Sequence, residues 1–210
     1  MKKTLSRAAA VAAAALLCAG ALSACEDGTI EVPGLPNDPV PTAPSAAEET
    51  ADLPGSVETK VTRVIDGDTV AVAPVEGVLE PTGDGADEHV VRVLGIDAPE
   101  MNYSSAEAPE CGAEAATNRL EQTLPVGMPV TIEYDAEADR TDRYGRSLAY
   151  VTTRGGTDAG LQQVADGYAM PWYPESEPQP ERVPEYRMAA DTAVSQSLGA
   201  HADCSSVGRG

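Results

Sequence analysis

The chain has 210 residues, and 34 Asp and Glu against 14 Lys and Arg give it a formal net charge of −20. This excess of acid argues against general affinity for polyanions, because contacts to phosphate groups use Lys and Arg. Composition alone therefore disfavours a nucleic-acid-binding protein, a conclusion that the motifs described below oppose.

Residues 1–25 have the pattern of a secretory signal peptide. A basic start that includes Arg7 precedes a small and apolar run at 8–22, which is too short and too weakly flanked to be a stable spanning helix. The run ends in LSAC, which resembles the lipobox of bacterial lipoproteins, where cleavage leaves a lipid-carrying Cys, here Cys25, at the new N-terminus. We expect a chain anchored by lipid to the outer face of the cell membrane, with partial release. Plain secretion with a free Cys25 is the alternative.

Residues 26–56 are predicted to be a disordered tether. They contain seven acidic residues, abundant Pro and no Lys or Arg. Such a segment buries too little apolar surface to offset the entropy of ordering it. The remaining residues, 57–210, have the length of about one ordinary domain. That domain holds 27 acidic and 11 basic residues, for a net charge of −16.

The domain reads as five short strands and a few helices. Strands are predicted at 57–66, 69–75, 89–96, 128–135 and 146–153, and helices at 112–124, 158–169 and 184–198. The first helix has apolar residues at the helical spacing of Ala116, Leu120 and Leu124, and the second is predicted to stop at Gly167. This order predicts a mainly β fold with helices, a small closed barrel with flanking helices.

Charged residues accompany apolar strand residues in three separate segments. These are VIDGDTV with Asp66 and Asp68, VRVLGIDAPE with Arg92, Asp97 and Glu100, and DRTDRYGRSLAY with Arg140, Asp142, Arg143 and Arg146. A charge inside an apolar strand is costly unless it is paired or used. Together the three segments point to a functional site.

The set of charges fits phosphodiester hydrolysis. Calcium prefers several oxygen ligands, which Asp68, Asp97 and a backbone carbonyl just after Asp97 could supply. Glu100 could orient or deprotonate a water near the metal, and two arginines could grip a phosphate and offset its developing charge. Arg92 and Asp97 would reach one site only if the strand bends between them. Gly95 is the expected place for that bend.

Each segment also has a simpler interpretation when it is taken singly. Asp66 and the following Gly could form only a hairpin turn. Asp97 and Glu100 could cap a helix. Arg146 could form an ordinary surface ion pair with Asp142. Three such coincidences in one short domain are harder to accept than one site.

The cysteines of the exported domain suggest one disulfide. Cys18 leaves with the signal peptide and Cys25 is assigned to the lipid, so Cys111 and Cys204 remain. Two cysteines in an exported domain most simply pair with each other. Two buried free thiols are the alternative.

Five strings carry a resemblance to a known family: VIDGDTV, RVLGIDAPE, CGAEA, DRYGRSLAYV and LQQVADGYA. With them, roughly residues 58–204 resemble the thermonuclease family of staphylococcal-nuclease-like domains. The resemblance implies an OB-fold, a five-stranded β-barrel with about three helices. It also implies an endonuclease that cleaves DNA and RNA with calcium and leaves 3′-phosphates.

The resemblance assigns roles by position. The calcium ligands are matched by Asp68, Asp97 and the backbone carbonyl of Ala98, and Asp66 matches a nearby acid. Glu100 matches the acid beside the attacking water, and Arg92 and Arg146 match the phosphate-binding arginines. Tyr173 matches a tyrosine of the nucleotide pocket. Ala98 stands where the family often has Thr, and because only the carbonyl is used the effect should be mild. Surface lysines are almost absent, which implies weaker, more salt-sensitive capture of substrate, or an enzyme for high-salt or divalent-rich surroundings. The partners expected are DNA or RNA and the membrane, for a monomer.

The alternative function is a catalytically weak or inactive binding module for nucleic acid or protein. Domains with this barrel also occur as inactive repeats, which typically lose the acids and arginines. All five charged positions, Asp68, Arg92, Asp97, Glu100 and Arg146, are present here. Their presence favours the enzyme.

Overall fold

The structure, a computed structural model, describes residues 54–82, 87–103 and 106–209. The predicted signal peptide, the lipidation site Cys25 and the predicted tether up to residue 53 lie outside the described residues. No helix within the described ranges is long and apolar enough to cross a membrane.

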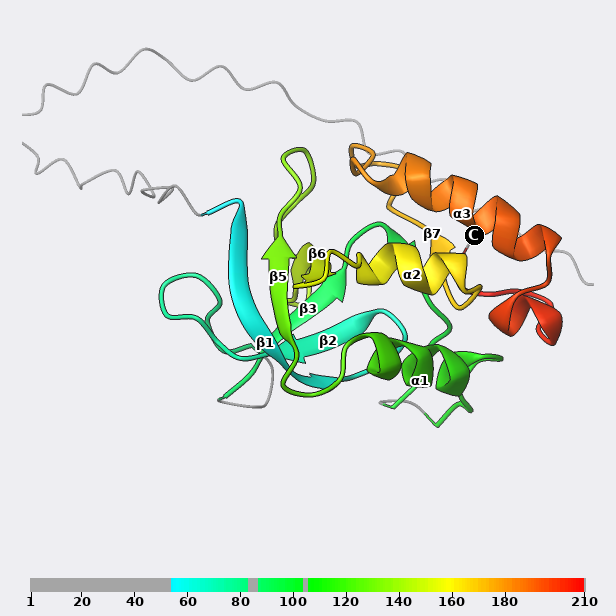
Figure 1. The fold of residues 1–210 in the computed structure, drawn as a ribbon, viewed down its shortest axis with the longest axis horizontal. Coiled ribbons are helices and arrows are strands. Elements are labelled where there is room, and N and C mark those ends of the chain that lie inside the picture. Colours follow the sequence, from blue (N-terminus) through cyan, green and yellow to red (C-terminus); the bar gives the residue numbers. More distant parts are fainter. Residues whose placement is uncertain (1–53, 83–86, 104–105, 210) are drawn as a thin grey trace, which may run out of the picture. The chain divides into compact units, whose positions relative to one another are not determined.

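Five strands close a barrel, as the sequence predicts (Figure 1). They are β1 (Ser56–Val64), β2 (Thr69–Val72), β3 (His89–Val93), β5 (Pro129–Glu133) and β6 (Ser147–Thr153), in the order β1-β2-β3-β6-β5. All neighbours are antiparallel except β3 and β6, which pair in parallel with Arg92 opposite Leu148. The predicted fold class, a barrel with helices, is confirmed.

Three helices lie on one side of the barrel (Figure 1). They are α1 (Ala113–Thr123), α2 (Ala159–Ala165) and α3 (Val183–Ser195), and a short 3-10 helix, η1 (Gly199–Ala202), follows them. The residues with the predicted apolar spacing form the face of the first helix that packs on the core, since Ala116, Leu120 and Leu124 are fully buried. Gly167 has φ +79° just after α2, a conformation that suits glycine and ends the helix where the sequence predicts.

The core is built mainly from valines on the strands. Val61, Val70, Val72, Val91 and Val93 are at most 1% exposed and belong to the same cluster as Leu120 of α1 and Leu124 just after it. Branched side chains suit the pleated strand surface, and burying each contributes about 1.5–3 kcal/mol. The barrel wall and the three helices therefore share one core.

The predicted strand at 89–96 is broken in two. β3 ends at Val93, and Gly95 with φ +81° turns the chain into a separate short strand, β4 (Ile96–Asp97). β4 pairs with β7 (Met170–Pro171), a strand that the sequence analysis did not predict in the Pro-rich crossing. The bend expected at Gly95 is present, and it separates Arg92 in β3 from Asp97 in β4.

A disulfide joins Cys111 to Cys204, 93 residues apart in the sequence. Cys111 lies just before α1, and Cys204 follows η1. The bridge therefore ties the chain after the last helix to the start of the first helix. Cross-links that close long loops are expected to stabilise a fold mainly by restricting the unfolded chain.

Gly67 is constrained by packing against α1. A Cβ placed on it would lie 2.6 Å from the Cβ of Ala98 and 2.8 Å from the Cβ of Ala116. Its carbonyl accepts a hydrogen bond from the Gln163 side chain of α2, which also donates to the carbonyl of Ala116. The glycine thus lets the turn before β2 sit directly on α1, a packing role in addition to the hairpin turn that the sequence suggests for Asp66 and this glycine.

We predict that Gly67→Ala destabilises the domain by about 1–3 kcal/mol, because the added methyl overpacks against two rigid alanine methyls. Urea unfolding followed by circular dichroism measures the change. Gly155→Ala is the matched control, since its Cβ would meet only Thr153 Oγ1 at 3.7 Å. Equal effects of the two substitutions would contradict this packing argument.

Candidate active site

Two buried aspartates meet at one arginine. Asp68 precedes β2 and is 3% exposed, and Asp97 ends β4 and is 4% exposed. Nη2 of Arg92 lies 2.8 Å from Asp68 Oδ2 and 3.1 Å from Asp97 Oδ1. Burial of three charges is costly, and here the arginine compensates both carboxylates at once. Arg92 is tolerated in β3 because it bridges two acids.

The remaining donors of Arg92 hold the backbone at the bend. Nη1 donates to the carbonyls of Val93 at 3.0 Å and Ile96 at 2.8 Å. A guanidinium has five N–H donors, and Nε of Arg92 has no partner among the residues that the structure describes. Arg92 thus fixes the geometry between β3 and β4 as well as the two aspartates.

Two hydrogen bonds orient the carboxylate of Asp68. Its Oδ1 accepts from Thr69 Oγ1 at 3.0 Å, and its Oδ2 accepts from the Ala98 amide at 2.8 Å. Asp66 Oδ1 accepts from the Asp68 amide at 3.2 Å, so Asp66 forms a turn with its own backbone. The turn interpretation of Asp66 therefore holds, and the same turn places Asp66 beside Asp68.

Asp97 has a partner from the far end of the domain. The Arg209 backbone amide donates to its Oδ2 at 2.8 Å across 112 residues of sequence. Nothing in the sequence analysis suggested this contact, because no local pattern links the two positions. Both oxygens of Asp97 are therefore engaged, one by Arg92 and one by the chain after the disulfide.

Three carboxyl groups in this cluster have pKa values above their ordinary values. Burial raises the pKa of Asp68 to about 6, with Arg92 opposing and Asp66 adding to the shift. Burial also raises the pKa of Asp97, which hydrogen bonding by Arg209 and the charge of Arg92 oppose. The pKa of Glu100 is raised by burial, then by the charge of Asp68. Crowded acids with raised pKa values mark a place where a bound cation would be favourable.

Glu100 stands beside the aspartates, and no residue that the structure describes engages its carboxylate. It is partly buried, and its side chain makes no hydrogen bond or ion pair with another residue that the structure describes. Its backbone is fixed instead, because its amide donates to Glu110 Oε2 at 2.9 Å and its carbonyl accepts from the Glu110 amide at 2.9 Å. A held backbone with an unpaired carboxylate suits a group that handles water.

Arg146 forms the ion pair that the simpler interpretation expected. Its Nε lies 2.7 Å from Asp142 Oδ2, and its amide donates to Asp142 Oδ1. Its guanidinium lies 5.5 Å from the ring centroid of the exposed Tyr144, which also stacks with Arg143. No contact joins Arg146 to the buried aspartates among the described residues. It nevertheless leads into β6, whose Leu148 is opposite Arg92.

The two aromatic residues of the Pro-rich crossing lie in different surroundings. Tyr173 contacts Gln179 and lies under the guanidinium of Arg187, on the α3 side. Trp172 donates its amide to the carbonyl of Gly95 and lies under the guanidinium of Arg209. The structure therefore connects Trp172, rather than Tyr173, to the buried aspartates.

A divalent metal would have few protein ligands at this site. No three His, Cys, Asp or Glu side chains converge well enough to hold a metal within the described part of the chain. Two carboxylates, Asp68 and Asp97, with the carbonyl of Ala98 and waters remain the donor set. Oxygen donors of this kind fit a hard cation such as calcium or magnesium, and raised carboxyl pKa values fit it equally.

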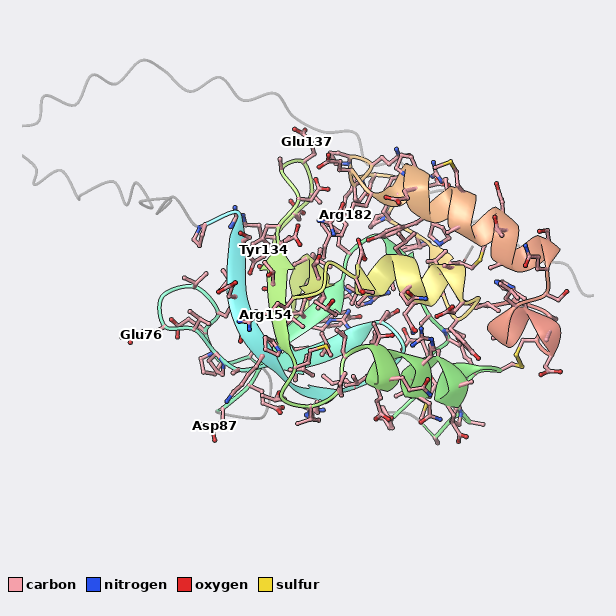
Figure 2. All side chains as sticks on the ribbon, viewed as in Figure 1. Glu76, Asp87, Tyr134, Glu137, Arg154 and Arg182 are labelled. Atoms are coloured by element: carbon pink, nitrogen blue, oxygen red, sulfur yellow. A yellow bond between two sulfur atoms is a disulfide. The ribbon has the colours of Figure 1, made fainter. Side chains whose placement is uncertain are left out.

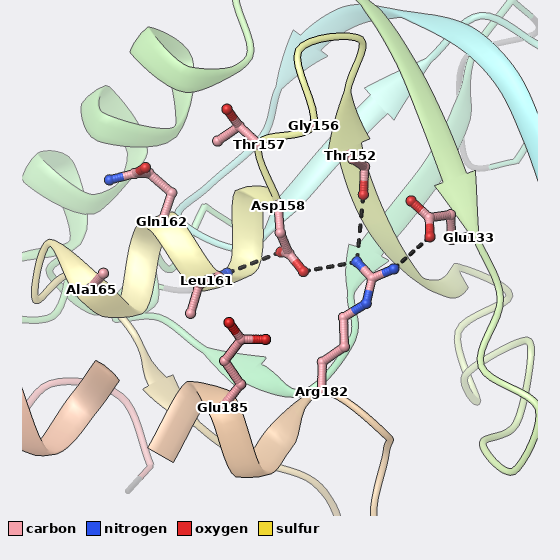
Figure 3. Close-up of a pocket in the computed structure, with 10 residues that line it drawn as sticks. All are labelled: Glu133, Thr152, Gly156, Thr157, Asp158, Leu161, Gln162, Ala165, Arg182 and Glu185. Atoms are coloured by element: carbon pink, nitrogen blue, oxygen red, sulfur yellow. Dashed lines mark hydrogen bonds and ion pairs between the residues drawn. The ribbon is translucent and has the colours of Figure 1, made fainter. Parts of the chain in front are cut away.

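A cavity of about 670 Å³ lies elsewhere, and Arg182 is among the residues that line it (Figure 3). Arg182 Nη1 donates to Asp158 at 2.8 Å and to Thr152 at 3.4 Å, and Nη2 pairs with Glu133. Asp158 also caps the N-terminus of α2. These charged groups pair with one another and attach α2 and α3 to the barrel. The charged residues that line the cavity therefore have a structural role.

Acidic residues also occupy the tips of loops. Glu76, Asp87 and Glu137 are exposed and lie at the outer ends of the loops that carry them (Figure 2). Their charge belongs to the solvated surface. It does not enter the cluster around Arg92.

Comparison with known proteins identifies the family. The family described as Staphylococcal nuclease homologue matches residues 90–202, more than half of the chain. The range includes the predicted Arg92, Asp97, Glu100 and Arg146, and it begins after Asp68.

Individual relatives of the chain are also named as nucleases. Endonuclease YhcR of Bacillus subtilis (strain 168) is 30% identical over 136 residues, 62% of this chain and 10% of that protein. Thermonuclease of Staphylococcus intermedius is 40% identical over 91 residues, 43% of this chain and 46% of that protein. The chain thus matches about a tenth of the first and just under half of the second. By the family match, the chain belongs to the staphylococcal nuclease homologues.

Proposed function

We propose that the chain is a calcium-dependent nuclease that hydrolyses phosphodiester bonds of DNA or RNA and is tethered outside the cell by a lipid on Cys25. The observation that carries the proposal is the buried cluster in which Arg92 bridges Asp68 and Asp97 beside Glu100, whose carboxylate no described residue engages. Membership of the nuclease family and the names of the relatives support the reaction class.

The proposed division of labour follows from the contacts. Asp68, Asp97 and the carbonyl of Ala98 would hold calcium, which when bound supplies charge to stabilise the phosphate and lowers the pKa of water. Glu100 would orient that water and accept its proton, since its raised pKa and its carboxylate oxygens, which no described residue engages, suit a general base.

The arginines would bind the phosphate. Nε of Arg92 has no partner among the described residues, and Arg146 lies in the segment that leads into the neighbouring strand β6. Arg146 contacts Asp142 through Nε, so its two Nη groups could grip a phosphate bidentately while the ion pair is kept. Asp142 would then serve to hold Arg146 ready before substrate arrives.

We predict that cleavage of single-stranded DNA by the purified chain requires calcium, stops with a chelator and falls about 10²- to 10⁴-fold in Glu100→Gln, the range expected for loss of a general base. The measurement is the initial rate at saturating calcium. Glu121→Gln, the same change at an exposed site of α1, is the matched control and should leave the rate unchanged.

Two results would contradict the assignment. Wild-type activity in Glu100→Gln would remove this residue from the chemistry. A folded chain with no cleavage of DNA or RNA over a range of salt would favour a binding module instead.

A second prediction concerns Asp68 and pH. Its folded pKa of about 6 lies above its ordinary 3.8, so this group stabilises the metal-free fold fully below pH ~4 and loses that contribution as pH rises through 6. Without metal, Asp68→Asn should therefore gain stability relative to wild type as pH rises from 5 to 7.5. Thermal unfolding at both pH values measures this.

Added calcium supplies the complementary comparison. It should raise the melting temperature of wild type at pH 7.5 more than at pH 5, because metal and proton compete for Asp68. The melting temperature of Asp68→Asn should respond much less. A calcium effect that is independent of both pH and Asp68 would contradict a metal site at this carboxylate.

A further inference from the structure

The residues after the disulfide form a strap that returns to Asp97. We define the strap as residues 204–209. Cys204 is bonded to Cys111 at the base of α1, and three residues later Val207 is only 3% exposed. Its two ends are therefore held, one by a covalent bond and one by the contacts of the last described residues.

The far end of the strap is fitted closely to Asp97. Gly208 has φ +59°, and a Cβ on it would overlap the carbonyl of Asp97 and lie 3.2 Å from its Oδ2. The next residue, Arg209, donates its amide to that same Oδ2 at 2.8 Å. Its guanidinium lies 5.5 Å from the ring centroid of Trp172. A glycine is required here because only a glycine permits both the backbone turn and this approach.

Trp172 links the strap to the bend that creates the site. Its amide donates to the carbonyl of Gly95 at 2.9 Å, in the turn between β3 and β4. The strap therefore contacts Asp97 directly through Arg209 and the Asp97 backbone through Gly208. It also contacts the neighbouring bend through Trp172.

We propose that the strap is a positioning element for the metal-binding carboxylate, with the Arg209 backbone amide fixing the rotamer of Asp97. The proposal rests on the proposed function, since it takes Asp97 as a metal ligand. Arg92 holds Oδ1 and Arg209 holds Oδ2, so the plane of the carboxylate is set from both sides. Hydrogen bonds to a ligating carboxylate fix its orientation, and losing one typically weakens metal binding 10- to 100-fold.

Positioning explains the geometry better than blocking does. Each carboxylate oxygen has two lone pairs, so one backbone N–H leaves room for a metal on the same group. The amide contributes no charge of its own, and the guanidinium of Arg209 is held over Trp172, where its charge lowers the pKa of Asp97 less than Arg92 does. A strap that blocked the site would be expected to place its cation between the two aspartates, where Arg92 already lies.

The test compares two substitutions at one residue of the full chain. Arg209→Pro removes the amide hydrogen, whereas Arg209→Ala keeps it and removes only the guanidinium. Isothermal titration calorimetry with calcium at pH 7.5 should show 10- to 100-fold weaker binding in Arg209→Pro. Arg209→Ala should bind calcium with an affinity much closer to that of wild type. Gly208→Ala, which pushes the strap away from Asp97, should weaken binding to a similar degree.

Controls separate positioning from folding. Ser206→Ala changes an exposed residue of the strap and should bind calcium as wild type does. Melting temperatures in chelator report whether a variant is folded. In cleavage assays the calcium concentration for half-maximal rate should rise in Arg209→Pro, while the rate at saturating calcium changes much less. A merely structural strap would lower the melting temperature without this shift.

The outcomes are distinct. Equal calcium affinity in Arg209→Pro and Arg209→Ala, or tighter binding in Arg209→Pro, overturns the positioning proposal and leaves the nuclease intact. Calcium binding without cleavage by wild type overturns the proposed function, and calorimetry still decides the role of the strap. A wild-type chain that binds no calcium overturns both.

Discussion

The buried arginine between two aspartates is the interaction on which the rest of the site depends. Arg92 reaches Asp68 from the turn before β2, Asp97 from β4, and the carbonyls of the bend between β3 and β4. Removing it would leave two carboxylates in a dry environment without compensation, an arrangement that costs several kcal/mol. The same cluster keeps the carboxyl pKa values raised, because one positive charge does not fully offset the burial of two acids.

The surrounding fold serves to deliver these groups. Gly95 turns the chain with a positive φ so that residues five apart reach one cluster, and Gly67 lets the turn that bears Asp68 sit on α1. Gln163, fully buried in α2, holds the carbonyl of Gly67 and the carbonyl of Ala116 together. Since the helices pack against the turn, their packing affects where Asp68, the proposed metal ligand, lies.

Local patterns predicted the parts of this protein that depend on neighbours in sequence. The spacing of Ala116, Leu120 and Leu124 identified the packing face of α1, and the separation of Arg92 from Asp97 required a bend that Gly95 provides. The parallel pairing of β3 with β6, the short strand β7 and the amide of Arg209 at Asp97 join distant segments and have no local signal. Tyr144, which stacks with Arg146, was overlooked although it lies inside a motif already singled out.

The acidic composition and the candidate site act on different length scales. Exposed charges are screened beyond about 8 Å at physiological ionic strength, so acids at loop tips such as Glu76 and Glu137 repel a polyanion mainly during its approach. Inside the cluster, partners lie about 3 Å apart in a region of low dielectric, where each interaction is much stronger. Under the proposed function, net charge would affect how readily a nucleic acid is captured, and the arrangement around Arg92 would act on a phosphate once it is held. A net charge of −20 is compatible with a nuclease because these two steps are separate.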